Sequence, residues 1–187
     1  IRNLDINFLY NSILITAAFY LFFITLRDFF HRKYRNLSQI TAHFSFSILI
    51  LSILFNNIFS SEVITNLKIN ETYQAQNLKI NFESIEQENK QNFKAIKGKF
   101  IVEDQSGLIE VMQPELRIYN QPNIVTSEAD IKTNIFTDKF MTMNYVQNQD
   151  YFNIRYQVKP FMIWIWISTI LLCLSGCLSL IRKKYEN

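Results

Sequence analysis

One ionisable side chain, His43, lies inside an apolar run that is long enough to cross a bilayer, Leu37 to Ile58. An ionisable residue at membrane depth is costly, which makes it a candidate for function. Its imidazole suits two roles: a hydrogen bond that holds neighbouring helices together, or axial ligation of haem iron. The residues alone favour the helix-packing role, and one histidine needs a second ligand from another chain to complete a six-coordinate haem.

Gln39, His43 and Ser47 follow one another at intervals of four residues, which predicts a polar stripe along one side of a helix. Such a stripe is expected to face other helices or a cavity, because polar groups that face lipid are penalised. His31 lies among charged neighbours, and we expect it to be solvated and to have no catalytic role.

Cys173 and Cys177 are four residues apart in another apolar run. Side chains at this spacing on one helix rarely reach disulfide geometry, and the pair is not a Cys-x-x-Cys redox motif. We interpret both as small buried residues of a helix-packing face that also holds Ser175, Gly176 and Ser179.

Three apolar blocks position these residues: Asn7 to Leu26, Leu37 to Ile58, and Pro160 to Ile181. As a helix rising 1.5 Å per residue, each block spans the roughly 30 Å hydrocarbon core. Basic residues flank the blocks: Arg27, Arg32, Lys33 and Arg35 after the first, and Arg182, Lys183 and Lys184 after the third. The positive-inside rule places both clusters on the inner side, so the N-terminus and segment 59–159 are expected outside.

Segment 59–159 contains runs of alternating apolar residues, which predict β-strands. The predicted strands are Tyr73–Ile85, Lys97–Val102, Leu108–Met112, a strand or turn over Leu116–Tyr119, and a closing hairpin of Phe140–Val146 and Tyr151–Val158. Asp104–Gly107 is a hairpin turn signal, Gln113-Pro114 breaks the run that follows, and Ser127–Ile135 predicts a short helix capped by Ser127.

These elements predict a membrane protein with three transmembrane α-helices and one β-rich extramembrane domain, a small barrel or sandwich, between helices two and three. Its parts are two helices with a basic inner loop over 1–58, the outer domain over 59–159, and the third helix with a basic tail over 160–187. The outer segment has no His, no Cys and no phosphate-binding Gly-rich loop, so we interpret it as a binding or positioning module.

The net charge of +3 comes from residues beside the apolar blocks, and the middle segment mixes both signs. No basic patch with interleaved aromatic residues is present, so nucleic acid is not an expected partner. Ile, Asn, Phe, Tyr and Lys are used heavily, while Ala and Gly are rare, which indicates an AT-rich and organellar genome.

Four stretches in the second half of the chain resemble, in order, the C-terminal part of the CcmF family. They are PELRIYN at Pro114–Asn120, TSEADI at Thr126–Ile131, TDKFM at Thr137–Met141, and VKPFMIWIW at Val158–Trp166. Upstream, Ala42-His43 stands where the family has an Ala-His start to the preceding membrane helix. Asp130 stands where the family has Ala.

This resemblance implies the haem lyase component of System I cytochrome c maturation, which joins haem vinyl groups to the Cys thiols of apocytochrome c. His43 matches an axial ligand of the family's stable haem b, which this chain would share with a partner chain. The implied partners are an N-terminal haem lyase chain with the Trp-rich motif and the other His ligands, a haem chaperone, apocytochrome c and its thiol-handling factor.

By the same resemblance the chain is a separately encoded C-terminal piece of a split haem lyase, or a fragment of a longer one, and the bond-forming residues are mostly on the partner chain. The expected location is the mitochondrial inner membrane, with segment 59–159 in the intermembrane space, and the bacterial inner membrane is the alternative. Two other functions stay open: a non-catalytic accessory or assembly subunit with no haem of its own, and a membrane-anchored receptor domain.

Overall fold

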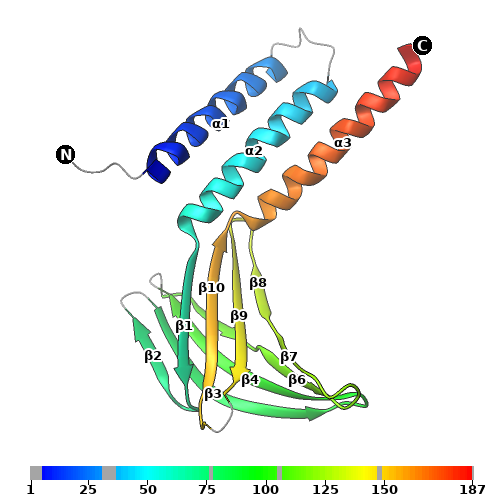
Figure 1. Cartoon of the computed structure of the whole chain (residues 1–187). Coiled ribbons are helices and arrows are strands. Elements are labelled where there is room, and N and C mark those ends of the chain that lie inside the picture. Colours follow the sequence, from blue (N-terminus) through cyan, green and yellow to red (C-terminus); the bar gives the residue numbers. More distant parts are fainter. Residues whose placement is uncertain (1–5, 31–36, 76–77, 105–106, 147–148, 187) are drawn as a thin grey trace, which may run out of the picture. The chain divides into compact units, whose positions relative to one another are not determined.

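The computed structural model describes residues 6–30, 37–75, 78–104, 107–146 and 149–186, and Figure 1 shows their helices and strands. The chain divides into two compact units. A helical unit comprises Ile1–Ser60, Asn134–Thr137 and Lys159–Asn187, and a β unit comprises Ser61–Thr133 and Asp138–Val158. The predicted inner-loop residues His31, Arg32, Lys33 and Arg35 lie outside the described residues.

The helical unit contains three long apolar helices: α1 (Ile6–Phe30), α2 (Leu37–Phe59) and α3 (Met162–Glu186). Each has a segment of at least 18 residues whose mean hydropathy, between 1.7 and 2.0, suits a membrane span. In Figure 1, α2 lies between α1 and α3 and packs against both. The predicted arrangement of three apolar helices with a β-rich domain between the second and the third is confirmed.

Small hydroxyl side chains line the contacts between the helices, where they let the backbones approach closely. The buried serines are Ser45, Ser47 and Ser52 on α2, and Ser168 and Ser175 on α3. Ser45 Oγ donates a hydrogen bond to the carbonyl oxygen of Thr41 in its own helix (2.7 Å), which satisfies the buried hydroxyl. Between helices, Ser38 Oγ donates to the carbonyl oxygen of Ser175 (2.7 Å), which fixes the register of α2 on α3.

The β unit is a sandwich of two sheets. One sheet has the strand order β1-β10-β9-β8, and the other has the order β2-β3-β4-β6-β7, with β5 also paired to β4. The strands are β1 (Ser61–Leu67), β2 (Thr72–Ala75), β3 (Leu78–Asn89), β4 (Phe93–Asp104), β5 (Ile109–Met112), β6 (Glu115–Tyr119), β7 (Val125–Glu128), β8 (Asp130–Thr133), β9 (Thr137–Tyr145) and β10 (Phe152–Pro160). The predicted closing hairpin corresponds to β9 and β10, which are neighbours in their sheet.

Both sheets contribute side chains to one hydrophobic core. Phe82 and Phe100, from neighbouring strands of one sheet, stack with their ring centroids 4.3 Å apart. Met143 and Ile154 come from the other sheet, and all four side chains are fully buried. Gly98 on β4 lies under this contact, since a Cβ there would be 2.6 Å from Phe100 Cε2 and 2.8 Å from Met143 Sδ. The close approach of the two sheets at this point therefore requires glycine.

The predicted helix over Ser127–Ile135 is wrong. This stretch forms β7, which pairs with β6, and β8, which pairs with β9 in the opposite sheet. Ser127 does not cap a helix: its Oγ donates to the carbonyl oxygen of Met143 (2.8 Å) and joins the two sheets. Asp130 also joins them, because its Oδ2 accepts the backbone N–H of Gln113 (2.7 Å). Strand pairing outweighs the local cap signal here.

One strand prediction also needs adjustment. The single run predicted over Tyr73–Ile85 is the antiparallel pair β2 and β3, with Ala75 opposite Leu78. The predicted break at Gln113-Pro114 is confirmed, since it falls between the end of β5 and the start of β6, and both strands pair with β4 in one continuous register. The N–H of Gly98 donates to the carbonyl oxygen of Pro114 (3.0 Å), which keeps the two short strands in line.

Candidate functional site

His43 lies on α2 with its side chain exposed, and so does Gln39 one turn before it. Ser47, in contrast, is fully buried against the other helices. Eight residues of an α-helix exceed two full turns, so Ser47 is rotated by about 80° from Gln39. The predicted single polar stripe is therefore split between an exposed face and a packed face.

The exposed side of α2 follows a regular spacing of four and three residues. We call it the His43 face: the exposed residues Gln39, His43, Phe46, Ile53 and Asn57, with the half-buried Ile50 among them. A four-three alternation places side chains along one seam that suits packing against another helix. His43 has no hydrogen bond or ion pair to any other residue that the structure describes. Its imidazole is available to a group outside this part of the chain.

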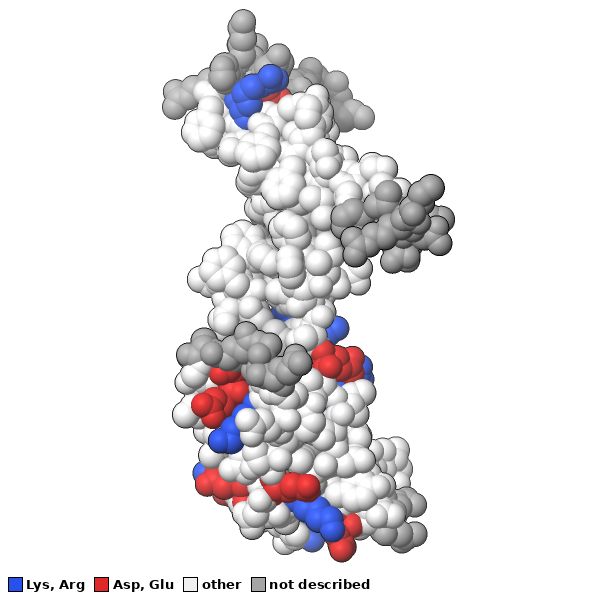
Figure 2. Space-filling view, turned by 90° about the vertical axis from the view of Figure 1, so that its left-hand side faces the viewer, with Lys and Arg blue, Asp and Glu red and all other residues white. Residues whose placement is uncertain are grey.

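The exposed face of α3 differs in chemistry from the His43 face. Its large exposed side chains, among them Ile170, Leu174 and Leu178, are apolar and suit contact with lipid. On the face shown in Figure 2, the described part of the helical unit presents no Lys, Arg, Asp or Glu across its middle.

The interpretation of Cys173 and Cys177 as buried packing residues is wrong. Both are exposed on α3 as free cysteines, while Ser175 between them is buried against α2. Gly176 is exposed as well, so the packed side of α3 follows Ser168 and Ser175 rather than the cysteines.

The donor set at His43 fits one axial position of a haem iron. The described residues hold no group of three or more His, Cys, Asp or Glu that could enclose a metal ion. A single imidazole with no partner among the described residues, such as that of His43, is a suitable axial donor. Phe46, three residues on along the same face and 48% exposed, offers an aromatic surface beside it.

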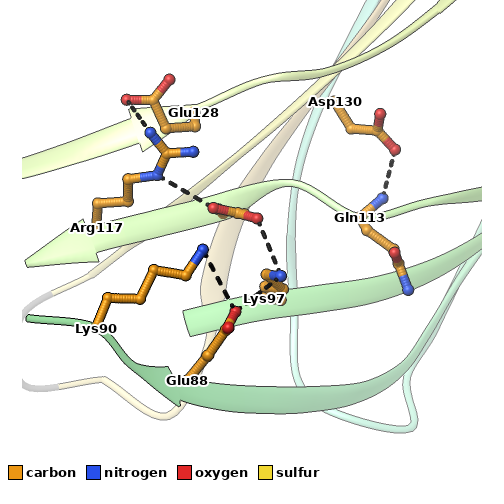
Figure 3. A network of polar contacts seen from close by, with 8 residues as sticks. Glu88, Lys90, Lys97, Gln113, Arg117, Glu128 and Asp130 are labelled. Carbon is orange, nitrogen blue, oxygen red and sulfur yellow. Dashed lines mark hydrogen bonds and ion pairs between the residues drawn. The ribbon is translucent and has the colours of Figure 1, made fainter. Parts of the chain in front are cut away.

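The β unit carries its charged side chains in a network across four neighbouring strand segments (Figure 3). The ion pairs run from Lys90 to Glu88 (3.7 Å), Glu88 to Lys97 (3.1 Å), Lys97 to Glu115 (3.4 Å), Glu115 to Arg117 (3.1 Å) and Arg117 to Glu128 (3.8 Å). The hydrogen bond from Lys97, followed by the charge of Lys90, lowers the pKa of Glu88 below its ordinary value. Hydrogen bonds to Glu88 and Glu115 raise the pKa of Lys97.

This network explains part of the PELRIYN stretch without giving it a catalytic role. Glu115, Arg117 and Tyr119 alternate along β6 on the same side of the sheet. Tyr119 and Phe93 pack with their ring centroids 5.2 Å apart, and the Arg117 guanidinium lies 5.2 Å from the centre of the Phe93 ring. Each acid in the network is paired with a base, which is the arrangement of a structural ion-pair network.

A second polar cluster, which sequence reasoning missed, joins the two sheets. Lys139 on β9 is only 12% exposed, and its Nζ lies 2.9 Å from Glu110 Oε2 and 3.4 Å from Asp104 Oδ2 in the opposite sheet. Burial, with the charges of Glu110 and Asp104, raises the pKa of the Tyr156 phenol well above its ordinary value. The alternation of Lys139 with Met141 and Met143 along β9 is the signal that points it inward.

A model of the CcmF C-terminal beta-sandwich matches residues 58–160, more than half of the chain. The chain belongs to the CcmF family. It is 29% identical over 120 residues to the cytochrome c-type biogenesis protein ccl1 of Rhodobacter capsulatus, covering 64% of this chain and 18% of that protein. It is 24% identical over 167 residues to cytochrome c-type biogenesis protein CcmF of Haemophilus influenzae, covering 87% of this chain and 26% of that protein.

The CcmF fold extends beyond the sandwich to the helices. A solved structure of the cytochrome c heme lyase CcmF superposes with a TM-score of 0.61 and 18% identity, and the match covers 89% of this chain and 28% of that one. The chain thus spans between about a fifth and a quarter of the length of the two CcmF relatives named above.

Proposed function

We propose that this chain is the C-terminal part of a cytochrome c haem lyase, in which His43 is one axial ligand of a haem b. Membership of the CcmF family supports the first half of the proposal. The observation that supports the second half is the exposed imidazole of His43 at membrane depth, which has no hydrogen bond or ion pair to the rest of the described chain. A bare imidazole that faces lipid is costly, whereas a ligated one is satisfied.

The residues of this chain would bind and orient the group rather than form the new bonds. A bound haem b supplies one-electron redox chemistry. Neutral imidazole offers a ring nitrogen to iron, and a helix anchored on both sides by α1 and α3 holds that nitrogen in a fixed direction. Phe46, exposed on the same face, would place an apolar aromatic side chain beside the bound group. The reaction on the outer side joins haem vinyl groups to reduced Cys thiols of apocytochrome c.

The proposal requires a partner chain. The CcmF relatives named above have about three quarters or more of their length outside the region that this chain matches. We propose that a separate N-terminal haem lyase chain supplies the second axial ligand and the Trp-rich motif, and that a haem chaperone delivers haem to this complex. Docking of apocytochrome c and its thiol-handling factor is assigned to the outer side. The AT-rich residue usage supports a split mitochondrial form in the inner membrane.

The test is the optical spectrum of the complex of this chain with its N-terminal partner, purified through a tag on the partner. His43→Gly is expected to remove the b-type absorbance while the two chains still purify together, and added imidazole is expected to restore it in the cavity. Asn57→Ala, on the same face of α2, is the matched control and is expected to leave the spectrum unchanged.

If His43→Gly assembles and keeps the haem signal, His43 is not a ligand, and the accessory-subunit alternative replaces the proposal. Recovery by imidazole separates ligation from a packing role, because a helix-packing histidine would gain no haem signal from free imidazole.

A further inference from the structure

The turn between β8 and β9, Asn134–Thr137, belongs to the helical unit, although both strands belong largely to the β unit. Asn134 shapes this turn: its Oδ1 accepts the backbone N–H groups of Phe136 (2.9 Å) and Thr137 (2.7 Å). The N–H of Asn134 donates to the carbonyl oxygen of Thr137 (3.0 Å) and closes the turn. The turn is therefore a rigid element with a defined direction.

Backbone groups of the turn bind the start of α3. The N–H of Phe161 donates to the carbonyl oxygen of Phe136 (2.7 Å). Nε1 of Trp164, in the first turn of α3, donates to the carbonyl oxygen of Ile135 (2.9 Å). The rings of Phe136 and Phe161 lie edge to face with their centroids 6.5 Å apart. The two hydrogen bonds use carbonyl oxygens of the turn, so they do not depend on which side chains stand at positions 135 and 136.

Ile135 and Phe136 are each 62% exposed, although both are large and apolar. Their depth is set by α3, whose membrane span begins at Met162. Trp164 lies in the first turn of that span, and a tryptophan that donates its N–H while its ring meets lipid is typical of the membrane–water interface. A turn bonded to this tryptophan is at the same depth, where the acyl chains begin.

We propose that Ile135 and Phe136 form a membrane-anchoring tip, which inserts into the boundary between lipid headgroups and acyl chains. The turn is joined to the start of a membrane span by two hydrogen bonds and one contact between aromatic rings, so lipid is the neighbour that reaches its exposed face. Asn56 at the end of α2 donates from Nδ2 to the carbonyl oxygen of Pro160 (2.6 Å), which holds the ends of both spans at this same level. The inference does not depend on haem binding.

The test places a polarity-sensitive fluorophore on the tip. Ile135→Cys and Phe136→Cys are made separately in the full chain with Cys173→Ser and Cys177→Ser, labelled, and reconstituted into phosphatidylcholine vesicles. Both hydrogen bonds to the start of α3 use backbone carbonyls, so both substitutions keep them, and Phe136→Cys removes only the ring contact with Phe161. Ile109→Cys, on β5 and 64% exposed, is the matched control outside the helical unit.

Both tip positions are expected to emit at shorter wavelength than the control and to be quenched several-fold more strongly by lipids brominated near the headgroup end of the chain. Iodide dissolved in the water is expected to quench the fluorophore at the control position but not the fluorophores at the tip. Iodide quenching of the tip equal to that of the control would overturn the proposal. Protection from iodide without quenching by brominated lipid would overturn it too, because the tip would then be covered by protein.

Discussion

Replacing Gly98 by Ala is expected to destabilise the β unit by about 1 to 2 kcal/mol. The new Cβ would lie 2.6 Å from Phe100 Cε2 and 2.8 Å from Met143 Sδ. Phe100 has no room to retreat, because its ring is fully buried and stacked on Phe82 with a centroid distance of 4.3 Å. Overpacking of this kind costs about 1–3 kcal/mol, and the smaller conformational entropy of unfolded Ala offsets about 0.4–1 kcal/mol.

The assay is proteolysis of the full chain in detergent over a series of urea concentrations, with the intact β unit as the signal. For a slope of about 1 kcal/mol per M, the unfolding midpoint is expected to fall by about 1 to 2 M urea. Gly176→Ala is the control, because a Cβ at this position of α3 meets no atom within 4 Å. A second test combines Gly98→Ala with Phe100→Leu, which makes space for the new methyl group.

Two results would refute this reasoning. One is a Gly98→Ala midpoint equal to that of the native chain, which would mean that the sheets separate at no cost. The other is a loss of the same size in the native and the Phe100→Leu backgrounds, which would mean that the Phe100 ring is not what the methyl group meets.

The remaining predictions concern the charged groups of the β unit. Lys139→Met is expected to lower the free energy of unfolding by roughly 1–3 kcal/mol in the same urea assay. The loss is smaller than for a fully buried ion pair, because Glu110 and Asp104 keep some contact with water. Glu88→Gln is expected to flatten the acid limb of the stability profile: the lowered pKa of Glu88 stabilises the fold above its ordinary 4.5, and this contribution is lost as the pH falls below that value. Tyr156→Phe is expected to flatten the alkaline limb, since the raised pKa of the buried phenol stabilises the fold below pH 10.0 and that contribution is lost at higher pH. Urea midpoints measured from pH 3 to pH 11 check both limbs.

Helices and most strands follow from the sequence because their signals are local. The three apolar runs are long enough to be unambiguous, and the alternation along Lys97–Val102 survives in the buried pattern of β4. The first strand, β1, escaped prediction because its alternation is weak: Thr65 points inward, while Ile64 is 60% exposed on the opposite side. Its identity depends on pairing with β10, a partner far along the chain.

The remaining differences arise where tertiary contacts decide. Ser127 carries a helix-cap signal, but its hydroxyl finds an acceptor in the opposite sheet. Cys173 and Cys177 share a helix with Ser175, and only the contact with α2 determines which of these side chains is buried. The exposure of His43 depends in the same way on how α2 is rotated between its two neighbours. The sequence identifies these residues as candidates for a buried or functional role. The rotation of each helix about its own axis then determines which of them are buried and which are exposed.

The pairing of β1 with β10 also sets an order of events during biosynthesis. Ser61 and Val158, opposite one another in the ladder, are separated by nearly all of the β unit. At about 5–20 residues per second, a ribosome needs roughly 5 to 20 s to make the chain between them. During that time β1 has left the bilayer with both edges unpaired. The sheet that contains β1 is completed only when β10 has been made, and α3 follows β10 directly in the chain. Insertion of α3 into the membrane and completion of the sandwich therefore take place at about the same time.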